Sequence, residues 1–194
     1  MKSSLILALC IFIIACSNIS DADMISIKTE IAKLKTNDEK TAYLENIHLL
    51  DQKVRTDEDT VLATYGHGSK EYKDHWKFIN QTDELNLAKV EAYLAAFGHP
   101  KKSELSDQAV HTPYIVIHHQ STAEPRRRNF QYLEDAYKSG DLDSGAFAFY
   151  LNRFYEFEFG HRLEMKNPFT EEIEIDTLVK ALNPFIQKYH HEND

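Results

Sequence analysis

Cysteine is nearly absent from this chain of 194 residues, and glycine and proline are scarce. The two cysteines are Cys10 and Cys16. The sequence after residue 16 therefore cannot form a disulfide, a thiolate metal site or a cysteine nucleophile. Six glycines and five prolines are too few for the frequent turns of an all-β sandwich. The chain is 42% hydrophobic and 27% charged, which excludes a disordered or multi-span membrane protein and favours a globular helical domain.

Positive charge is also in short supply. The chain has 22 Lys and Arg against 31 Asp and Glu, a formal net charge of −9. Because nucleic-acid affinity depends largely on Lys and Arg displacing counterions, we expect no nucleic-acid partner. We also expect no cofactor and no metal. The sequence has no phosphate loop or His-Glu-x-x-His motif, and Pro113 disturbs the alignment of His111 with His118.

Long apolar runs are missing except for one at the N-terminus, LILALCIFIIA, at residues 5–15. Eleven helical residues are too short for the ~30 Å hydrocarbon core of a bilayer, so the run indicates a signal peptide. Its end, Ile13-Ile14-Ala15-Cys16, resembles a bacterial lipobox. The alternative is an ordinary signal peptide with a chance cysteine.

The lipobox resemblance implies removal of residues 1–15 and lipidation of Cys16, with residues 16–22 as a tether. The lipid bilayer is then a partner, and the protein belongs to the cell envelope. Several acyl chains on one residue would hold it firmly. Ser17 follows the cysteine where an Asp would indicate inner-membrane retention in enteric bacteria, so the outer membrane is favoured.

Caps and hydrophobic spacing predict a single all-α domain of about seven helices over residues 23–194. The first two expected helices cover 23–36 and 37–64, the third is capped by Ser69, and the fourth runs from Thr82 or Asp83 to Phe97. After a short helical start at Ser106, the next helix restarts at Thr112 and Pro113. The remaining helices cover 125–137, 144–160 and a final stretch broken by Pro184. A strand stays an alternative in two places. The β-branched run Tyr114-Ile115-Val116-Ile117 is also typical of a buried strand, so 112–120 is either helix or strand, and the alternating run at 171–175 leaves a short strand pair in the C-terminal third as an option.

Polar residues on the second predicted helix, His48, Asp51, Gln52 and Arg55, fall at spacings of three and four and so share one stripe. They either form a solvated surface with an Asp51–Arg55 ion pair or lie at the edge of the core, where a carboxylate and a guanidinium would be held rigidly.

Two further places offer polar side chains. Asp83 and Asn86 lie three residues apart at the start of the fourth predicted helix, where Asp83 has an ordinary role as an N-cap. His118 and His119 end an apolar run, and adjacent helical residues point about 100° apart. One of the two histidines can therefore face the core while the other faces outward.

Arginines supply the candidate cations. Arg126-Arg127-Arg128 is the only basic run, at a helix start where it is either solvated or an anion-binding edge. Arg153 lies among aromatic residues, where it must pair with a carboxylate or stack on a ring. We expect Arg153 to be the functional cation, with Arg162 as a weaker candidate.

The order of these motifs resembles an uncharacterised family of bacterial secreted proteins and lipoproteins common in Bacteroidetes. Its members show Asp-Gln-x-x-Arg, Gln-His and Asp-Arg in this order. Here the motifs read Asp51-Gln52-x-x-Arg55, His118-His119 and Asn152-Arg153, so His118 and Asn152 depart from the pattern. The resemblance implies a shared polar pocket of Asp51, Arg55, His119 and Arg153, without an established activity.

Three functions remain open from the sequence. The first is a membrane-anchored domain that binds a small polar or anionic ligand between helices through the residues at positions 51, 52, 55, 83, 86, 119 and 153. The second is a hydrolase in which His119 is the general acid or base, Asp51 orients it and Arg153 stabilises negative charge. The third is a structural envelope scaffold.

Overall fold

The computed structural model describes residues 19–163 and 172–193. Over these residues the chain forms seven α-helices and no strand, which confirms the predicted all-α class. The helices are α1 (Asp21–Lys33), α2 (Asn37–Tyr65), α3 (Lys70–Phe97), α4 (Asp107–His119), α5 (Glu124–Ser139), α6 (Ser144–Phe159) and α7 (Glu172–Asn193). The predicted signal peptide, Cys16 and residues 17 and 18 of the predicted tether lie outside the described residues, whereas residues 21 and 22, the end of that tether, already belong to α1.

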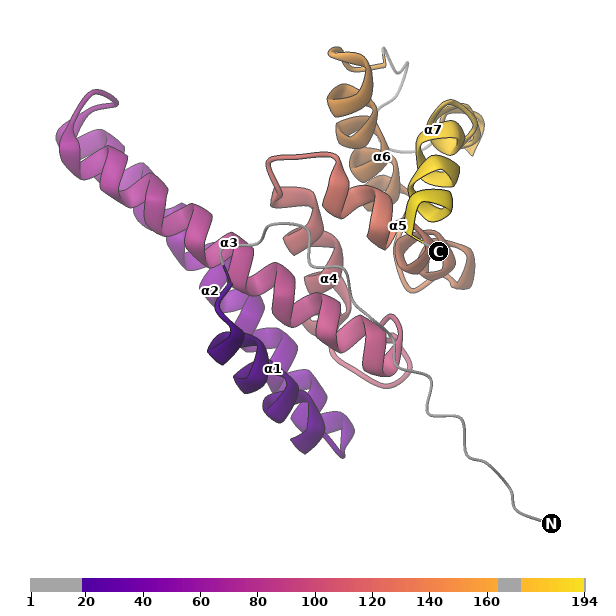
Figure 1. Ribbon diagram of the computed structural model, residues 1–194, viewed down its shortest axis with the longest axis horizontal. Coiled ribbons are helices and arrows are strands. Elements are labelled where there is room, and N and C mark those ends of the chain that lie inside the picture. Colours follow the sequence, from indigo (N-terminus) through magenta and orange to yellow (C-terminus); the bar gives the residue numbers. More distant parts are fainter. Residues whose placement is uncertain (1–18, 164–171, 194) are drawn as a thin grey trace.

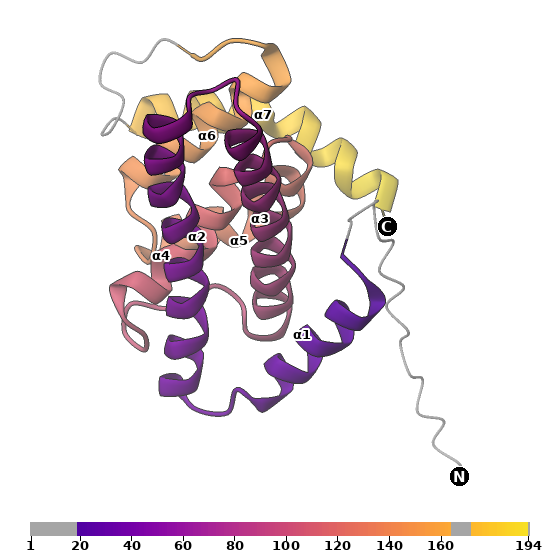
Figure 2. The same ribbon diagram turned by 90° about the vertical axis from the view of Figure 1, so that its left-hand side faces the viewer.

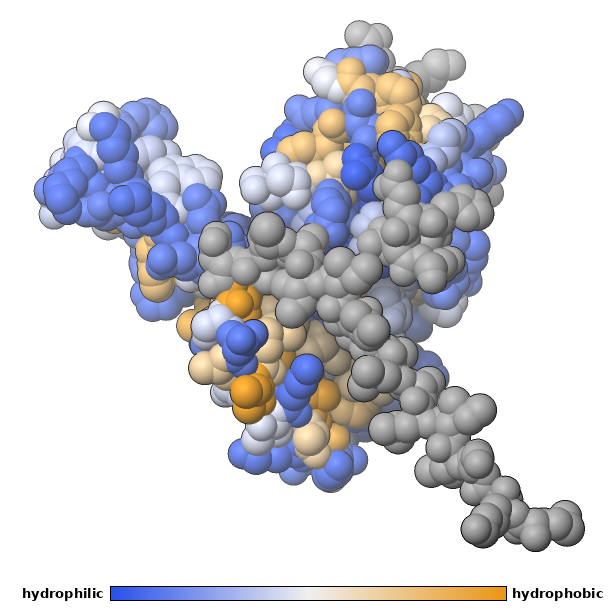
Figure 3. Space-filling view, in the orientation of Figure 1, coloured by the Kyte–Doolittle hydropathy of each residue, from blue (hydrophilic) through white to orange (hydrophobic). Residues whose placement is uncertain are grey.

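Two groups of helices meet at α4. The long helices α2 and α3 form an antiparallel hairpin whose tip projects away from the rest of the chain (Figure 1), and α1 lies against α3 (Figure 2). Helices α5, α6 and α7 form the second group, and α4 contacts α2 and α3 on one side and α5 and α6 on the other. The space-filling view shows a notch between the hairpin tip and the α5–α7 group (Figure 3).

The third and fourth predicted helices are a single helix. Ser69 caps α3 by accepting a hydrogen bond from the Tyr72 backbone N–H, and the helix continues to Gly98, which adopts a positive φ of 73°. The predicted start at Thr82 or Asp83 is wrong, and so is the N-cap role of Asp83. No glycine or proline interrupts the polar residues around position 82, and buried side chains on both sides keep the helix continuous.

Helix α4 is also continuous. The predicted restart at Thr112 is wrong, because Ser106 caps a helix that passes through Pro113. The Thr112 hydroxyl donates to the backbone oxygens of Gln108, at 2.8 Å, and Leu44 on α2, at 3.2 Å. This buried hydroxyl therefore joins α4 to α2 at the point where the proline interrupts the hydrogen bonding of the helix backbone.

The C-terminal strand expectation is wrong for residues 172–175, which begin α7; residue 171 lies outside the described part of the chain. The alternation that resembles a strand is short, whereas Ile175, Leu178, Leu182 and Ile186 continue at helical spacing and are buried. The helix also passes through Pro184, where a break was expected. The predicted helices at 23–36, 37–64, 125–137 and 144–160 agree with α1, α2, α5 and α6 within a few residues.

The basic run contains a buried cation. Arg126 has no exposed surface, and its guanidinium donates to the backbone oxygens of His118, Gln120 and Thr122. These carbonyls lie at and just beyond the end of α4, where a helix has unpaired acceptors and partial negative charge. The guanidinium also lies over the Phe157 ring, 4.6 Å from its centre. Burial lowers the pKa of Arg126 to about 10.

The expectation that the whole run is a solvated or anion-binding edge is therefore wrong for Arg126. Its two neighbours are ion-paired and partly exposed: Arg127 with Glu158, and Arg128 with Glu91 and Glu124. Arginine is among the residue types that are rarely buried, so nothing in the sequence singled out position 126.

Replacing Arg126 should destabilise the fold strongly. Arg126→Gln leaves carbonyl groups at the end of α4 without donors, and we expect the free energy of unfolding to fall by about 3 kcal/mol. Urea unfolding monitored by circular dichroism measures this. Lys138→Gln is the control, since Lys138 is exposed and forms one ion pair with Glu134. Equal effects of the two substitutions would contradict the role assigned to Arg126.

Candidate functional site

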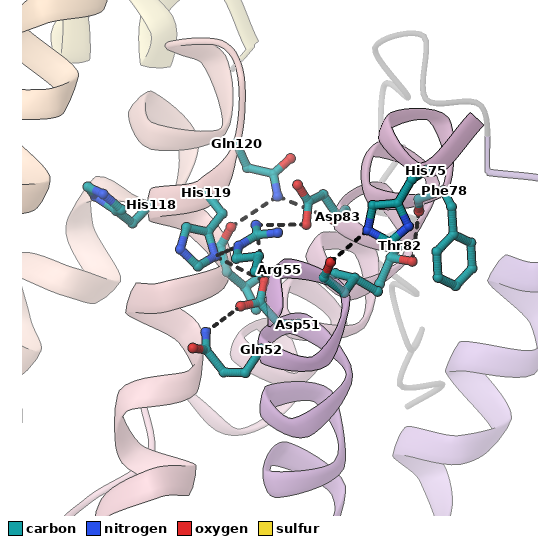
Figure 4. A network of polar contacts seen from close by, with 12 residues as sticks. Asp51, Gln52, Arg55, His75, Phe78, Thr82, Asp83, His118, His119 and Gln120 are labelled. Atoms are coloured by element: carbon teal, nitrogen blue, oxygen red, sulfur yellow. Dashed lines mark hydrogen bonds and ion pairs between the residues drawn. The ribbon is translucent and has the colours of Figure 1, made fainter. Parts of the chain in front are cut away.

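Four of the predicted site residues meet where the hairpin contacts the end of α4 (Figure 4). Asp51 and Arg55 lie one turn apart on α2, Asp83 lies on α3, and His119 is the last residue of α4. We call these four residues the α2–α4 network. The predicted stripe on α2 thus lies at the edge of the core and faces both neighbouring helices.

Arg55 bridges the network. Its Nη2 donates to Asp83 Oδ1 at 2.9 Å and lies 3.3 Å from Asp51 Oδ1. Its Nε lies 2.9 Å from His119 Nδ1. One guanidinium therefore links three helices, because its donors form a rigid fork that can serve several acceptors at once.

The Nδ1 nitrogen of His119 has two competing partners. It lies 2.9 Å from Arg55 Nε and 3.0 Å from Asp51 Oδ1. A neutral imidazole nitrogen either carries a proton or offers a lone pair. With a proton on Nδ1 the ring donates to Asp51, and Nε2 is an acceptor. Without it, Nδ1 accepts from Arg55, and Nε2 is a donor. Whether Nδ1 pairs with Asp51 or with Arg55 therefore decides whether Nε2 accepts or donates a hydrogen bond.

The two carboxylates have opposite electrostatic environments. The Asp51 side chain is 1% exposed. Burial alone opposes its ionisation, but the hydrogen bond from His119 and the nearby charges of His119 and Arg55 outweigh it and lower the pKa of Asp51. For Asp83, burial is the dominant influence and raises the pKa despite the Arg55 guanidinium. Asp51 is therefore the firmly ionised partner of the histidine.

Amide side chains surround the network. Gln52, which was predicted, donates to Asp51 Oδ2 at 2.8 Å. Gln120, which sequence reasoning missed, donates from Nε2 to the backbone oxygens of Asp83 and Val116. Its position next to the paired histidines was the signal that could have identified it. Asn86 is buried one turn after Asp83, and its Nδ2 has no hydrogen-bond partner among the described residues.

Arg153 lies outside the α2–α4 network. It donates to Glu156 at 2.6 Å and lies over the Phe157 ring, 5.0 Å from its centre. This confirms that an arginine among these aromatics pairs with a carboxylate and stacks. The structure therefore divides the predicted pocket into two parts, one at the α2–α4 network and one on α6. The candidate Arg162 lies with Arg153 on the second part.

His118 connects the two parts. Its ring stacks on Phe149 of α6 at 4.6 Å between centres and lies 5.9 Å from the His119 ring. Figure 4 shows it turned away from the network. The two adjacent rings thus point in different directions (Figure 4), and both are half-buried. Burial, with the nearby Arg126 guanidinium, lowers the pKa of His118 to about 3, so it is neutral at physiological pH.

Two hollows lie near the second part. A small one of about 20 Å³ is lined by Phe149, Asn152, Arg153 and Arg162. A larger one of about 210 Å³ lies among α5, α6 and α7. Its lining is Arg127, Glu158, Phe185, Lys188 and Tyr189, of which only Arg127, from the basic run, was a candidate from the sequence.

Residues 19–163 and 172–193 contain no group of three His, Cys, Asp or Glu side chains placed to hold a metal ion. Within the same ranges, no helix has the length and apolar character required to cross a bilayer. Comparison with protein-family models, curated proteins and solved structures gives no match. The family resemblance of the sequence motifs therefore stays a prediction.

The two carboxylates should respond differently to neutralisation. At pH 7, Asp51→Asn should lower the free energy of unfolding by about 2 kcal/mol, because it removes a buried charged acceptor. Asp83→Asn should cause no loss, because its surroundings disfavour the charge.

Urea unfolding over a pH series measures both effects. A lowered carboxyl pKa contributes stability above the unfolded value near 3.9. That stability is lost as the pH falls through the folded value, so the deficit of Asp51→Asn should shrink below about pH 4. Equal losses for the two variants at pH 7 would contradict the assignment.

Proposed function

We propose that the helical domain binds a small polar ligand through the Nε2 nitrogen of His119, at the end of α4 where this helix meets the hairpin. The observation that carries this proposal is the position of His119 Nδ1, 3.0 Å from Asp51 Oδ1 and 2.9 Å from Arg55 Nε. Both inner contacts involve one nitrogen, while the side chain is 25% exposed. The ring is thus held in a fixed orientation with its other nitrogen available to a ligand.

The charges of the network favour a hydroxyl-bearing ligand over an anion. Arg55 faces two carboxylates, Asp51 and Asp83, so its positive charge is already compensated. A bound anion would also lie close to those carboxylates. Because Nε2 is a donor in one tautomer and an acceptor in the other, it suits a hydroxyl group, which can also play either role. Sugars and other polyols are therefore the ligand class we favour.

A hydrolase is the second candidate, and the 3.0 Å separation between Asp51 and His119 favours it. In the tautomer that donates to Asp51, Nε2 can accept a proton from a bound water while Asp51 stabilises the imidazolium that forms. Arg55, not Arg153, is the cation beside this pair. The scaffold alternative rests on the same contacts, because Arg55 engages both carboxylates.

A ligand panel with matched histidine variants tests these possibilities. Sugars, cell-wall fragments and organic acids are screened by thermal shift, where a ligand at about 100 times its dissociation constant stabilises a protein by about 2.7 kcal/mol. We expect a hydroxyl-rich compound to stabilise the wild type and His161→Gln, an exposed control, but not His119→Gln. Conversion of the bound compound, lost in His119→Gln and Asp51→Asn, would establish the hydrolase. Equal thermal shifts of the wild type and His119→Gln with every compound would contradict the ligand site and leave the structural scaffold as the remaining function.

We further propose that the domain is held at the cell envelope by acylated Cys16, with the outer membrane favoured. The support is the sequence Ile13-Ile14-Ala15-Cys16 at the end of a short apolar run. Expression with labelled palmitate in a bacterium should label the wild type and place it in the membrane fraction. Cys16→Ser should remove the label and the membrane association, whereas Cys10→Ser should change neither. An unlabelled, soluble wild type would contradict the anchor.

A further inference from the structure

A second cluster of polar side chains lies on α6 and the residues just after it. Arg153 Nη1 donates to Glu156 Oε2 at 2.6 Å, and Arg162 Nε donates to the same oxygen at 3.0 Å. Each guanidinium has five N–H donors and donates one of them to this oxygen. Two cations thus share one carboxylate, and the cluster carries an excess positive charge.

The surroundings add to this positive charge. Arg126 lies close enough to Arg153 for the charge of Arg153 to disfavour the charge of Arg126. Among the described residues, the Arg126 guanidinium forms hydrogen bonds only to neutral carbonyl groups. Arg126, Arg153 and Arg162 all oppose protonation of His118. The potential here is therefore positive in a chain whose net charge is −9. Such a local reversal of sign attracts anions.

The cluster is accessible and has an apolar side. The side chains of Arg153, Arg162 and Glu156 are 37%, 55% and 32% exposed. Phe149 is 39% exposed and borders the same hollow of about 20 Å³. Figure 3 shows apolar and strongly hydrophilic surface side by side on the α5–α7 group. The hollow has room for about one water molecule, so a larger ligand would lie across its rim.

We infer that Arg153, Arg162 and Phe149 form a binding site for an oxyanion, a phosphate or carboxylate, that carries an aromatic or short apolar group. The oxyanion takes the place of the Glu156 carboxylate between the two guanidiniums, which match the geometry of such groups. Phe149 contacts the apolar part of the ligand. This site is separate from the His119 Nε2 site and does not depend on it.

Phenyl phosphate and inorganic phosphate serve as probes, titrated into the full-length protein with side-chain ¹⁵N signals of arginine as the readout. Arg153→Gln and Arg162→Gln should each weaken phenyl phosphate binding by about fivefold, the ratio that corresponds to an exposed ion pair of ~1 kcal/mol. Glu156→Gln should tighten binding by a similar factor, because it removes the internal competitor. Lys138→Gln is the exposed control and should match the wild type.

Phe149→Ala should reduce the preference for phenyl phosphate over inorganic phosphate without affecting inorganic phosphate itself. His119→Gln should leave phenyl phosphate binding intact, so that failure of this site and failure of the His119 site are distinguishable. Circular dichroism verifies that each variant is folded. Unchanged affinity in Glu156→Gln together with unchanged affinity in both arginine variants would overturn the inference.

A vesicle-binding experiment distinguishes a lipid headgroup from a soluble molecule as the source of the oxyanion. Vesicles of phosphatidylglycerol and of phosphatidylcholine are sedimented with the Cys16→Ser protein. Retention on phosphatidylglycerol that requires Arg162 assigns the site to a lipid headgroup. Phenyl phosphate binding without such retention assigns it to a soluble molecule. The absence of both would overturn the inference.

Discussion

The buried guanidinium of Arg126 is the contact on which the arrangement around α4 depends. It donates hydrogen bonds to the backbone oxygens of His118, Gln120 and Thr122, for which the end of α4 has no backbone N–H donors. An unpaired cation in the interior would cost several kcal/mol, but here the aligned carbonyls and the Phe157 ring compensate part of that cost. The Tyr150 hydroxyl donates to the backbone oxygen of Arg126 and ties the same point to α6. The end of α4 is thereby fixed between the two groups of helices.

Fixing the end of α4 places two adjacent histidines in contrasting surroundings. His119 meets Asp51, Arg55 and Asp83 on the hairpin side, where carboxylates outnumber cations. His118 turns toward α6, where arginines outnumber carboxylates. Neighbouring residues on one helix therefore divide a polar region into an acidic half and a basic half. This division explains why a single pocket containing both Arg55 and Arg153 does not form.

Much of the fold could be predicted from the sequence because caps and apolar spacing are local signals. Ser69, Ser106 and the glycines after α3 and α5 mark helix ends that the structure retains. The errors arose where a local signal competes with burial. Thr82, Pro113 and Pro184 each suggest a boundary, yet buried neighbours continue the helix through all three positions. Short-range chemistry identifies where a helix can end, and packing decides whether it does.

The site was predictable only in part, for the same reason. The spacing of Asp51 and Arg55 placed both on one face of a helix, and their convergence with Asp83 and His119 follows from the packing of α2, α3 and α4. The role of Arg126 had no signal in the sequence, because a run of three arginines looks the same whether one is buried or none is. The separation of Arg153 from the network depends on where α6 lies, which residue spacing does not encode.

The distribution of burial along the hairpin has a consequence for its motion. Val54 is the last buried residue of α2, and Ile79 is the first of α3. The distal segment between them has no share of the hydrophobic core and rests on contacts between its own two helices, such as that from Tyr72 to Glu58. Segments with so little buried area open at low free-energy cost, well before the whole domain unfolds. Arg55 and Asp83 stand at the base of this segment, so a hinge in the hairpin would have its pivot at the polar network.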